Sequence, residues 1–356
     1  MTTSRYEPGP DDLADLVAGL PAYRARQLHD GLYRQLADLP ELTTLPRPLR
    51  DELADRLPLA LRPVTESVAD GGETVKWLWA LHDGTQVETV LMHHRSWSTV
   101  CASTQAGCAM ACSFCATGQA GFERHLTTGE VVEQVVRAAR RARDDGRRLS
   151  NVVFMGMGEP LANYEVTWAA VRRLHDSLGL GARHLTISTV GVVPGIRRLS
   201  AEDLPVNLAV SLHAADDATR DELVPLNRRY PLDALMAACA DYLRATGRRI
   251  SFEWALIDGV NDRPRDLRAL AERARDLPLA AHVNLIPLNP TPGYPVRGTP
   301  PARVRAFRDG LVALGVAATV RRTRGTDIDA ACGQLRAAHA GGPAPVSLAR
   351  RPRARR

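Results

Sequence analysis

Short apolar runs alternate with helical runs from about residue 95 to residue 320, and this alternation limits the fold more than any other feature. Strands separated by helical patterns of about 10 to 15 residues are typical of βα units with parallel strands. About six such units follow one another, so the sequence predicts an α/β protein with a complete or partial TIM-like (β/α)6 barrel. The candidate strands are 98–103, 151–157, 184–189, 206–212, 250–257 and 282–288, and 317–320 is a candidate for one more.

The chain before the barrel divides into two further sections. Residues 1–72 are predicted to form a small helical domain, because apolar residues recur at helical spacing in the stretches 23–33 and 46–57. Two β-type runs follow on either side of Asp83-Gly84, a residue pair that favours hairpin turns. The expected domains are an accessory helical domain at 1–72, a β-hairpin at 73–94, a barrel at 95–335 and a basic tail at 336–356.

The clearest helix signal lies inside the barrel section. Thr127 and Glu130 form the pattern of a capping box, in which each side chain satisfies a backbone N–H group at the start of the helix. Apolar residues follow on one face: Val131, Val132, Val135 and Val136. A helix is therefore predicted to begin at this point.

The net charge of +6 comes from the end of the chain. Six of the 46 basic residues lie in 336–356, which holds no acid, so the other 40 basic residues are matched by the 40 acidic ones. Such a tail suits contact with phosphate backbones, and a solvated disordered end fits it equally well. Lys76 is the one lysine of the chain, a preference for arginine that indicates a coding bias.

The sequence also bounds where the protein works. No apolar run reaches the roughly 18 residues that a membrane span needs, and the start of the chain lacks the apolar segment of a secretory signal. We therefore expect a cytoplasmic protein with no membrane partner. Six cysteines are too few for a disulfide scaffold, and clustered thiols in a reducing compartment more often indicate metal binding or catalysis.

Three of the six cysteines, Cys108, Cys112 and Cys115, fall within eight residues, just after the first barrel strand. Structural zinc usually takes four protein ligands in paired spacings, and this CxxxCxxC pattern has no fourth cysteine close by. Three thiolates on a four-iron cluster would leave one iron without a protein ligand, and an open coordination position is where a reacting molecule binds. The pattern thus favours a four-iron cluster over zinc.

Polar residues recur at the ends of the other candidate strands. Active sites of barrels form at the C-terminal ends of the strands, so these residues point to one pocket. Gly158 and Glu159 follow one strand, where a glycine lets backbone approach a ligand closely and a carboxylate suits an ammonium group. The other candidate ligand-binding residues are Ser188, Ser211, Leu212, His213 and Asn289.

The cysteine pattern after the first strand, with Phe114 just before its last member, resembles that of the radical S-adenosylmethionine (SAM) superfamily. The resemblance implies one [4Fe-4S] cluster held by Cys108, Cys112 and Cys115. It implies that S-adenosylmethionine binds the open iron and is cleaved reductively to a 5′-deoxyadenosyl radical. The segment 155–160 is similar to the GGEP-type motif of the superfamily, which implies that Glu159 receives the amino group of S-adenosylmethionine.

Longer segments resemble the RlmN/Cfr family of adenosine methyltransferases, and the similarity covers almost the whole chain. The segments are 115–124, 159–164, 257–262 and above all 324–335. The resemblance implies that Cys332 is first methylated and that a radical formed on its S-methyl group adds to the adenine. It further implies that Glu88 removes the proton of the adenine carbon, and that Cys101 releases the product by forming a disulfide with Cys332.

The same resemblance implies the substrates and partners. The expected reaction makes 2-methyladenosine in 23S rRNA at the peptidyl-transferase centre and in the adenosine beside the tRNA anticodon. A flavodoxin is the implied electron donor, and we expect a monomer.

Several alternatives stay open at this stage. A Cfr-type enzyme would methylate C8 of the same rRNA adenosine with the same cluster and thiols, although 1–72 and the segment around Cys332 look more like the C2 enzyme. A non-catalytic iron–sulfur or zinc RNA-binding protein would need neither Cys332 nor Glu88. Cys101 also fits a buried small apolar residue, and Cys239 is expected in the core.

Overall fold

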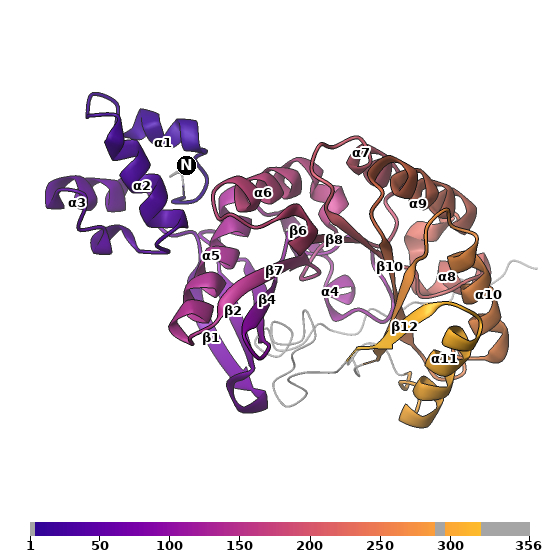
Figure 1. Cartoon of the computed structure of the whole chain (residues 1–356). Coiled ribbons are helices and arrows are strands. Elements are labelled where there is room, and N and C mark those ends of the chain that lie inside the picture. The colour runs from indigo at the N-terminus through magenta and orange to yellow at the C-terminus, as the bar shows by residue number, and fades with distance from the viewer. Residues whose placement is uncertain (1–3, 289–295, 322–356) are drawn as a thin grey trace, which may run out of the picture.

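The computed structural model describes residues 4–288 and 296–321, and the described chain opens with a small helical domain. Three α-helices bury Leu13, Leu28, Leu32 and Leu53 among themselves and their connections. They are α1 (Pro10–Leu16), α2 (Tyr23–Tyr33) and α3 (Arg47–Arg56). The helices predicted at 23–33 and 46–57 are thereby confirmed. Figure 1 shows this domain at one end of the molecule, beside α5 and α6.

The rest of the described chain is built on one ten-stranded sheet, which curves through the molecule (Figure 1). Its strands, in spatial order, are β1 (Arg62–Ala69), β2 (Thr74–Ala80), β3 (Gln86–His93), β4 (Trp97–Cys101), β7 (Arg148–Phe154), β8 (Leu185–Thr189), β9 (Asn207–Ser211), β10 (Ile250–Leu256), β11 (His282–Pro287) and β12 (Ala317–Val320). The first four pair antiparallel, and the strands from β4 to β12 pair parallel. The predicted α/β fold with a partial barrel is confirmed, including the extra strand at 317–320.

Helices cover the outer, convex side of the curved sheet, as Figure 1 shows for α5, α6, α7, α9, α10 and α11. The α-helices of this part are α4 (Ala116–Gln119), α5 (Thr128–Asp144), α6 (Tyr164–Asp176), α7 (Val193–Leu199), α8 (Asp217–Leu223), α9 (Leu232–Thr246), α10 (Pro264–Arg275) and α11 (Pro301–Ala313). Short 3-10 helices are η1 (Leu39–Glu41), η2 (Asp70–Gly72), η3 (Pro160–Asn163), η4 (Ala182–His184) and η5 (Pro225–Arg228). None of the helices in residues 4–288 and 296–321 combines the length and the apolar character that crossing a bilayer would need.

The start of α5 shows why these residues form a helix there. Thr127 accepts a hydrogen bond from the backbone N–H of Glu130, and Glu130 accepts one from the backbone N–H of Thr127, which is the predicted capping box. The predicted apolar face of the helix is buried in the core: Val131, Val132, Val135 and Val136. Cys239, on α9, is also fully buried, as expected of a core cysteine.

The segment 62–69 differs from the expectation that residues 1–72 are helical. It forms β1, whose residues alternate between exposed and half-buried positions along the edge of the sheet. A strand at an edge needs only one buried face and tolerates Pro63, so it lacks the dense β-branched run that marks a central strand. The predicted hairpin at 73–94 is present as β2 and β3, and it belongs to the main sheet because β3 pairs with β4.

The helical domain is joined to the barrel through the side chain of Glu133 on α5, which is fully buried. Its carboxylate accepts hydrogen bonds from the backbone N–H groups of Ala60 (2.7 Å) and Leu61 (3.2 Å). Arg137, one turn later, donates to the same carboxylate at 2.9 Å and to the carbonyl of Leu61 at 2.7 Å. One buried carboxylate thus accepts hydrogen bonds from two backbone N–H groups and one guanidinium, at the point where the chain leaves the helical domain.

Replacing Glu133 by alanine should lower the free energy of unfolding by about 3 kcal/mol, because a buried arginine and two backbone N–H groups lose their partner. Denaturant unfolding followed by circular dichroism measures this change. Asp51→Ala is the matched control, since Asp51 faces Arg47 in an exposed i,i+4 pair, and its cost should stay below about 0.5 kcal/mol. Equal costs for the two variants would contradict the role given to Glu133.

Candidate active site

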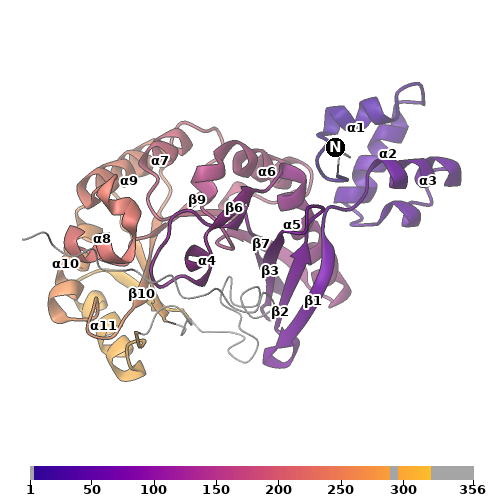
Figure 2. The same cartoon turned by 180° about the vertical axis from the view of Figure 1, so that it is seen from behind.

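The three clustered cysteines lie on a loop held by a separate two-stranded sheet. β5 (Gln105–Gly107) pairs antiparallel with β6 (Phe122–His125), and the loop between them contains α4. The strands meet closely at Gly107, whose φ is +74° and whose position leaves no room for a Cβ, since such an atom would lie 2.0 Å from the carbonyl oxygen of Gly121. Figure 2 shows α4 inside the curve of the sheet. The loop therefore projects its thiols into the concave side of the barrel.

All three thiols line one cavity, with a volume of about 150 Å³. The other predicted ligand-binding residues among its walls are Gly158, Glu159, Ser188, Ser211 and His213. A second cavity of about 240 Å³ shares walls with it, including Cys115, Ser188, Ser211 and His213. Residues that are more than 100 positions apart in the sequence thus meet around one space, at the C-terminal ends of the strands, as the sequence predicts.

The number of thiols in the cavity bears on the kind of metal centre they fit. Structural zinc usually takes four protein ligands, whereas this cavity offers three thiols from one loop. In a four-iron cluster each cysteine sulfur binds a different iron. The donor set fits a four-iron cluster with one iron left without a cysteine.

The same thiols need a positive partner before they can act as ligands. Burial raises the pKa of the Cys108 thiol to about 12, and burial also raises the pKa of Cys112 well above its ordinary value. Both side chains would stay protonated at neutral pH without a cation beside them. Because metal ions deprotonate the thiols that coordinate them, this loop is chemically suited to a metal centre and poorly suited to free thiolate chemistry.

Glu159 is held firmly at the opposite wall of the cavity. Its carboxylate accepts hydrogen bonds from the backbone N–H groups of Leu161 (3.0 Å) and Val190 (2.9 Å), and its own N–H donates to Gln105 Oε1 at 2.8 Å. Burial raises the pKa of Glu159 to about 7, although these hydrogen bonds oppose the shift. The preceding Gly158 has a φ of +103° and lies against Gln105, so a side chain there would be excluded. A buried carboxylate so placed suits a cationic ligand group.

Arg220 organises the neighbouring strand ends. It is 1% exposed, and its guanidinium donates to the carbonyl oxygens of Leu212 (3.0 Å) and Val190 (2.6 Å) and to Asn227 Oδ1 (2.9 Å). These contacts tie the end of β8 to the end of β9, where Ser188 and Ser211 line the cavity. Burial lowers the pKa of Arg220 to about 10, so it stays positive at neutral pH, and its charge acts on Cys112 of the cysteine loop.

His213 lines the cavity with an uncharged imidazole ring. Its Nδ1 accepts a hydrogen bond from the backbone N–H of Ala255 at 3.0 Å, and its ring packs edge-on against Phe114 at 4.6 Å between centroids. Burial, followed by the charge of Arg220, lowers the pKa of His213 to about 3. The residue has a φ of +58°, a conformation that asparagine also adopts more readily than most residues. It shapes the cavity and carries no charge at neutral pH.

Glu88 and Cys101 lie on the same concave face as the cavity, on β3 and β4. Cross-strand partners point to the same side of a sheet, and Cys101 pairs with Val90 on β3 and with Val153 on β7. Glu88 is two residues from Val90 and is therefore on that side as well. Both side chains are buried, at 2% and 4% exposure, and neither is among the walls of the three-thiol cavity.

Lys76 on β2 pairs with Glu88 inside the sheet. Its Nζ lies 3.0 Å from Glu88 Oε2, and both side chains are almost completely buried. The backbone of Glu88 is fixed as well, because its carbonyl oxygen accepts a hydrogen bond of 2.6 Å from Ser103 Oγ. The single lysine of the chain is thus the charge partner of a candidate catalytic carboxylate.

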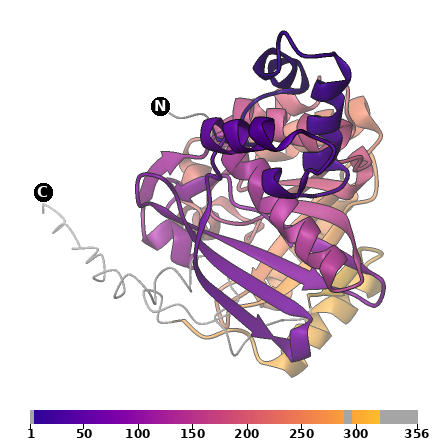
Figure 3. The same cartoon turned by 90° about the vertical axis from the view of Figure 1, so that its left-hand side faces the viewer.

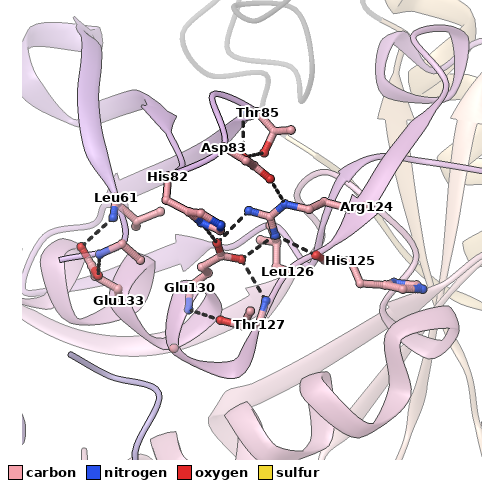
Figure 4. A network of polar contacts seen from close by, with 12 residues as sticks. Leu61, His82, Asp83, Thr85, Arg124, His125, Leu126, Thr127, Glu130 and Glu133 are labelled. Atoms are coloured by element: carbon pink, nitrogen blue, oxygen red, sulfur yellow. Dashed lines mark hydrogen bonds and ion pairs between the residues drawn. The ribbon is translucent and has the colours of Figure 1, made fainter. Parts of the chain in front are cut away.

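A polar network anchors the hairpin that carries Glu88 to the end of the cysteine loop (Figure 4). Arg124 on β6 donates to Asp83 in the hairpin turn at 2.5 Å and to both carboxylate oxygens of Glu130 on α5 at 2.8 and 2.9 Å. The hydrogen bond to Glu130 is the main cause that raises the pKa of Arg124. Three separate elements are held together by one guanidinium.

The structure brings eight of the thirteen candidate residues together around the three-thiol cavity. Glu88 and Cys101 lie outside its walls, and the other three candidates are Leu212, Asn289 and Cys332. Leu212 is fully buried and lies outside the cavity walls, and its backbone N–H and carbonyl are bonded to Glu253 and Arg220. Asn289 and Cys332 lie outside the described residues. Sequence reasoning missed Arg220, which no motif marks. It noticed Lys76 and attributed it to coding bias, although a lone lysine among arginines was the available signal.

The comparisons with known proteins agree with this geometry. A model of the radical SAM superfamily matches residues 102–271. The dual-specificity RNA methyltransferase RlmN of Parafrankia sp. is 55% identical over 95% of this chain and 94% of its own length, and that of Chloroflexus aurantiacus is 50% identical over 94% and 93%. The crystal structure of a radical SAM methyltransferase from Sphaerobacter thermophilus matches with a TM-score of 0.90 at 53% identity, over 94% of this chain and 99% of that chain.

The partial barrel and the three thiols on the loop after its first parallel strand define a radical SAM enzyme. Within that superfamily the chain belongs to the RlmN family of RNA methyltransferases, because the similarity to its members extends over nearly the whole length of both proteins.

The pKa of His213 predicts how stability depends on pH. The folded chain keeps this imidazole neutral down to about pH 3, whereas the unfolded chain protonates it below about pH 6.5, so unfolding takes up one proton between those values and stability falls as the pH falls. His213→Asn should reduce the slope of the unfolding free energy between pH 4 and 6 by about 1.4 kcal/mol per pH unit. Urea unfolding of both metal-free proteins measures the slopes, and parallel curves would refute the assignment.

Proposed function

We propose that this protein methylates C2 of adenosine in RNA, in the 23S rRNA peptidyl-transferase centre and beside the tRNA anticodon. The observation that carries the proposal is the convergence of Cys108, Cys112 and Cys115 with Glu159 around one cavity. The relatives named above support RNA as the substrate. A cytoplasmic location and a flavodoxin-like electron donor are consistent with this reaction.

The three cysteines would hold a [4Fe-4S] cluster, and Glu159 would hold the amino group of S-adenosylmethionine. When bound, these groups supply a 5′-deoxyadenosyl radical that abstracts hydrogen from a methyl group. Gly158 leaves the backbone open to the ligand, and Ser188, Ser211 and His213 form the remaining walls. Asn289 is proposed as a further contact to S-adenosylmethionine on the basis of the family motif. Leu212 is proposed on the same basis.

Three side chains of the chain itself would carry out the transfer. Cys332 carries the methyl group that becomes bonded to the adenine carbon. Glu88 takes the proton that leaves this carbon. Cys101 then attacks the sulfur of Cys332 and forms a disulfide with it. The bond from that sulfur to carbon breaks, and the carbon takes the electron pair and a proton to become the methyl group of the freed base. Covalent stages of this kind divide one difficult substitution into easier steps.

The contacts of Glu88 support its role as the proton acceptor. The carboxylate of Glu88 is 2% exposed, and the ammonium group of Lys76 lies 3.0 Å from its Oε2. This ion pair holds the buried carboxylate in place and gives it a positive partner. Cys101 projects from the adjacent strand β4 on the same face, so the two groups can meet one substrate base.

The C2 reaction has one competitor from the same family and one from another class. A Cfr-type reaction at C8 of the same rRNA adenosine would use the same cluster and cysteines. A non-catalytic RNA-binding protein with an iron–sulfur or zinc centre would not need the buried Lys76–Glu88 pair. The 55% identity to the protein of Parafrankia sp. that is named RlmN favours the C2 reaction.

Cys332→Ala should abolish methylation while leaving RNA binding within about twofold of the unaltered protein. The unaltered protein, reconstituted anaerobically with iron and sulfide, should yield 2-methyladenosine from an rRNA fragment. Mass spectrometry of nuclease digests identifies the product. Turnover by Cys332→Ala would refute the covalent route, and 8-methyladenosine as sole product would favour the C8 alternative.

Lys76→Met should lower the rate of methylation at least about 100-fold, the range expected for loss of a general base, because the buried carboxylate of Glu88 loses the positive partner that holds it in place. It should also destabilise the fold by about 3 kcal/mol, since one member of a buried pair is left alone. Single-turnover methylation and urea unfolding measure the two effects.

The double variant Lys76→Met/Glu88→Gln separates charge from packing. It should be more stable than Lys76→Met alone, because no unpaired charge remains, and it should be just as inactive. If Lys76→Met kept more than half of the normal rate, the assignment of Glu88 as a base supported by Lys76 would be wrong.

A further inference from the structure

A cleft of about 630 Å³ lies between the helical domain and the barrel, remote from the three thiols. It is formed where α2 and α5 end, where β7 begins, and by the turn between α6 and β8. Figures 1 and 3 show the helical domain lying over this part of the barrel. The cleft opens at the N-terminal ends of β7 and β8, whereas the three-thiol cavity lies beyond their C-terminal ends.

The walls of this cleft are strongly basic. Five arginines line it, and no aspartate or glutamate does: Arg34, Arg143, Arg147, Arg148 and Arg183. Outside the tail the chain carries equal numbers of basic and acidic residues. Positive charge is therefore concentrated at this cleft, although the chain outside the tail has no net charge. A general preference for arginine over lysine does not produce such a concentration.

Most of these arginines also lack the partners that arginines have elsewhere in the chain. In residues 4–288 and 296–321, Arg34, Arg147, Arg148 and Arg183 have no carboxylate within 4.0 Å. Arg143 pairs with the neighbouring Asp144 at 3.1 Å and donates to the carbonyl oxygen of Gln35. On the outer helices, by contrast, arginines such as Arg137 and Arg172 are paired with acids. The cleft thus keeps guanidinium groups available to an outside anion.

Helix ends explain only part of this charge. Arg34 caps the C-terminus of α2 and Arg143 lies in the last turn of α5, and both positions favour cations through the helix dipole. Arg147 and Arg148 lie beyond the end of α5, and Arg183 belongs to the short η4 turn. The last three have no comparable structural reason to gather at one cleft.

Ser150 and a glycine turn complete the walls of this cleft. Ser150 is 9% exposed, and its hydroxyl oxygen is closed off from solvent with no hydrogen-bond partner in the described chain. The Leu178–Gly181 turn opposite is shaped by Gly179, whose φ is +79°.

We infer that this basic cleft binds the phosphodiester backbone of the substrate RNA, at a segment distant from the reacting adenosine. The inference rests on the proposed function only in taking RNA as the substrate. Guanidinium groups form paired hydrogen bonds with phosphate oxygens, and several along one cleft match the repeated charge of a nucleic-acid strand. β7 alone spans seven residues, or about 20 Å between the two ends.

That separation has a consequence for substrate choice. An RNA that reaches both ends of the barrel must be folded and extend well beyond the target nucleotide. The cleft then adds affinity for a structured RNA and none for a short hairpin. It contributes to binding in the ground state and the transition state alike, so it changes KM and leaves kcat as it is.

The test compares Arg147→Ala/Arg183→Ala with Arg268→Ala, an exposed arginine on α10 that is also without a carboxylate partner in the described chain. Fluorescence anisotropy with a long domain fragment of 23S rRNA, titrated at several salt concentrations, gives the affinity and its salt slope. The double variant should bind at least tenfold more weakly, with a slope smaller by about 2, since about one counterion is released per phosphate contact. The control should match the unaltered protein.

Methylation assays on the holoenzyme complete the test. The double variant should raise KM for the long fragment at least tenfold with kcat unchanged, and should treat a short target hairpin as the unaltered protein does. Thermal unfolding checks that the fold is intact, and Arg147→Lys/Arg183→Lys should restore most of the affinity. Equal binding by the double variant and the Arg268→Ala control would overturn the inference. Failure of the unaltered protein to methylate any RNA would instead overturn the proposed function, because binding is measured without turnover.

Discussion

The alternation of side chains along one continuous sheet is the constraint on which the candidate active site depends. Cys101 on β4 shares its row with Val90 on β3 and Val153 on β7, and that row continues through Thr186 on β8. Every second residue on each strand faces the concave side, so Glu88, Ser188 and Ser211 face it too. A shift of register by one residue on any of these strands would turn its functional side chain to the opposite face.

The cysteine loop is held by other means. It lies between two strands of a separate small sheet, and its approach to the barrel depends on a position that admits only glycine, Gly107. Burial keeps Cys108 and Cys112 protonated until a cation is present. The chain therefore prepares the shape of a metal centre in advance, while the charge that the thiols acquire depends on the metal itself.

Periodicity and motif spacing were sufficient for most of the fold. The alternation of apolar and helical runs predicted the strands from β4 to β12, and the Thr127–Glu130 pattern predicted the start of α5, because both signals are local. The edge strand β1 escaped prediction, since an edge position needs no strong β pattern. The contacts of Arg220 and Lys76 escaped too. Each of these two side chains bonds to a residue on another strand or loop, Arg220 to Val190 and Lys76 to Glu88. No local sequence pattern encodes such a pairing.

The placement of β3 and β4 within the main ladder has a mechanical consequence. The hairpin that carries Glu88 does not move as a separate unit. Its strand β3 is bonded through β4 and β7 to the same sheet that carries Ser188 and Ser211. Because only β1 lies outside this hairpin in the strand order, opening the sheet between β3 and β4 would detach β1, β2 and β3 together. The strands that carry Glu88, Cys101 and the cavity walls should therefore unfold together in one cooperative transition. Any motion that admits a large RNA would then come from the loops at the C-terminal ends of the strands.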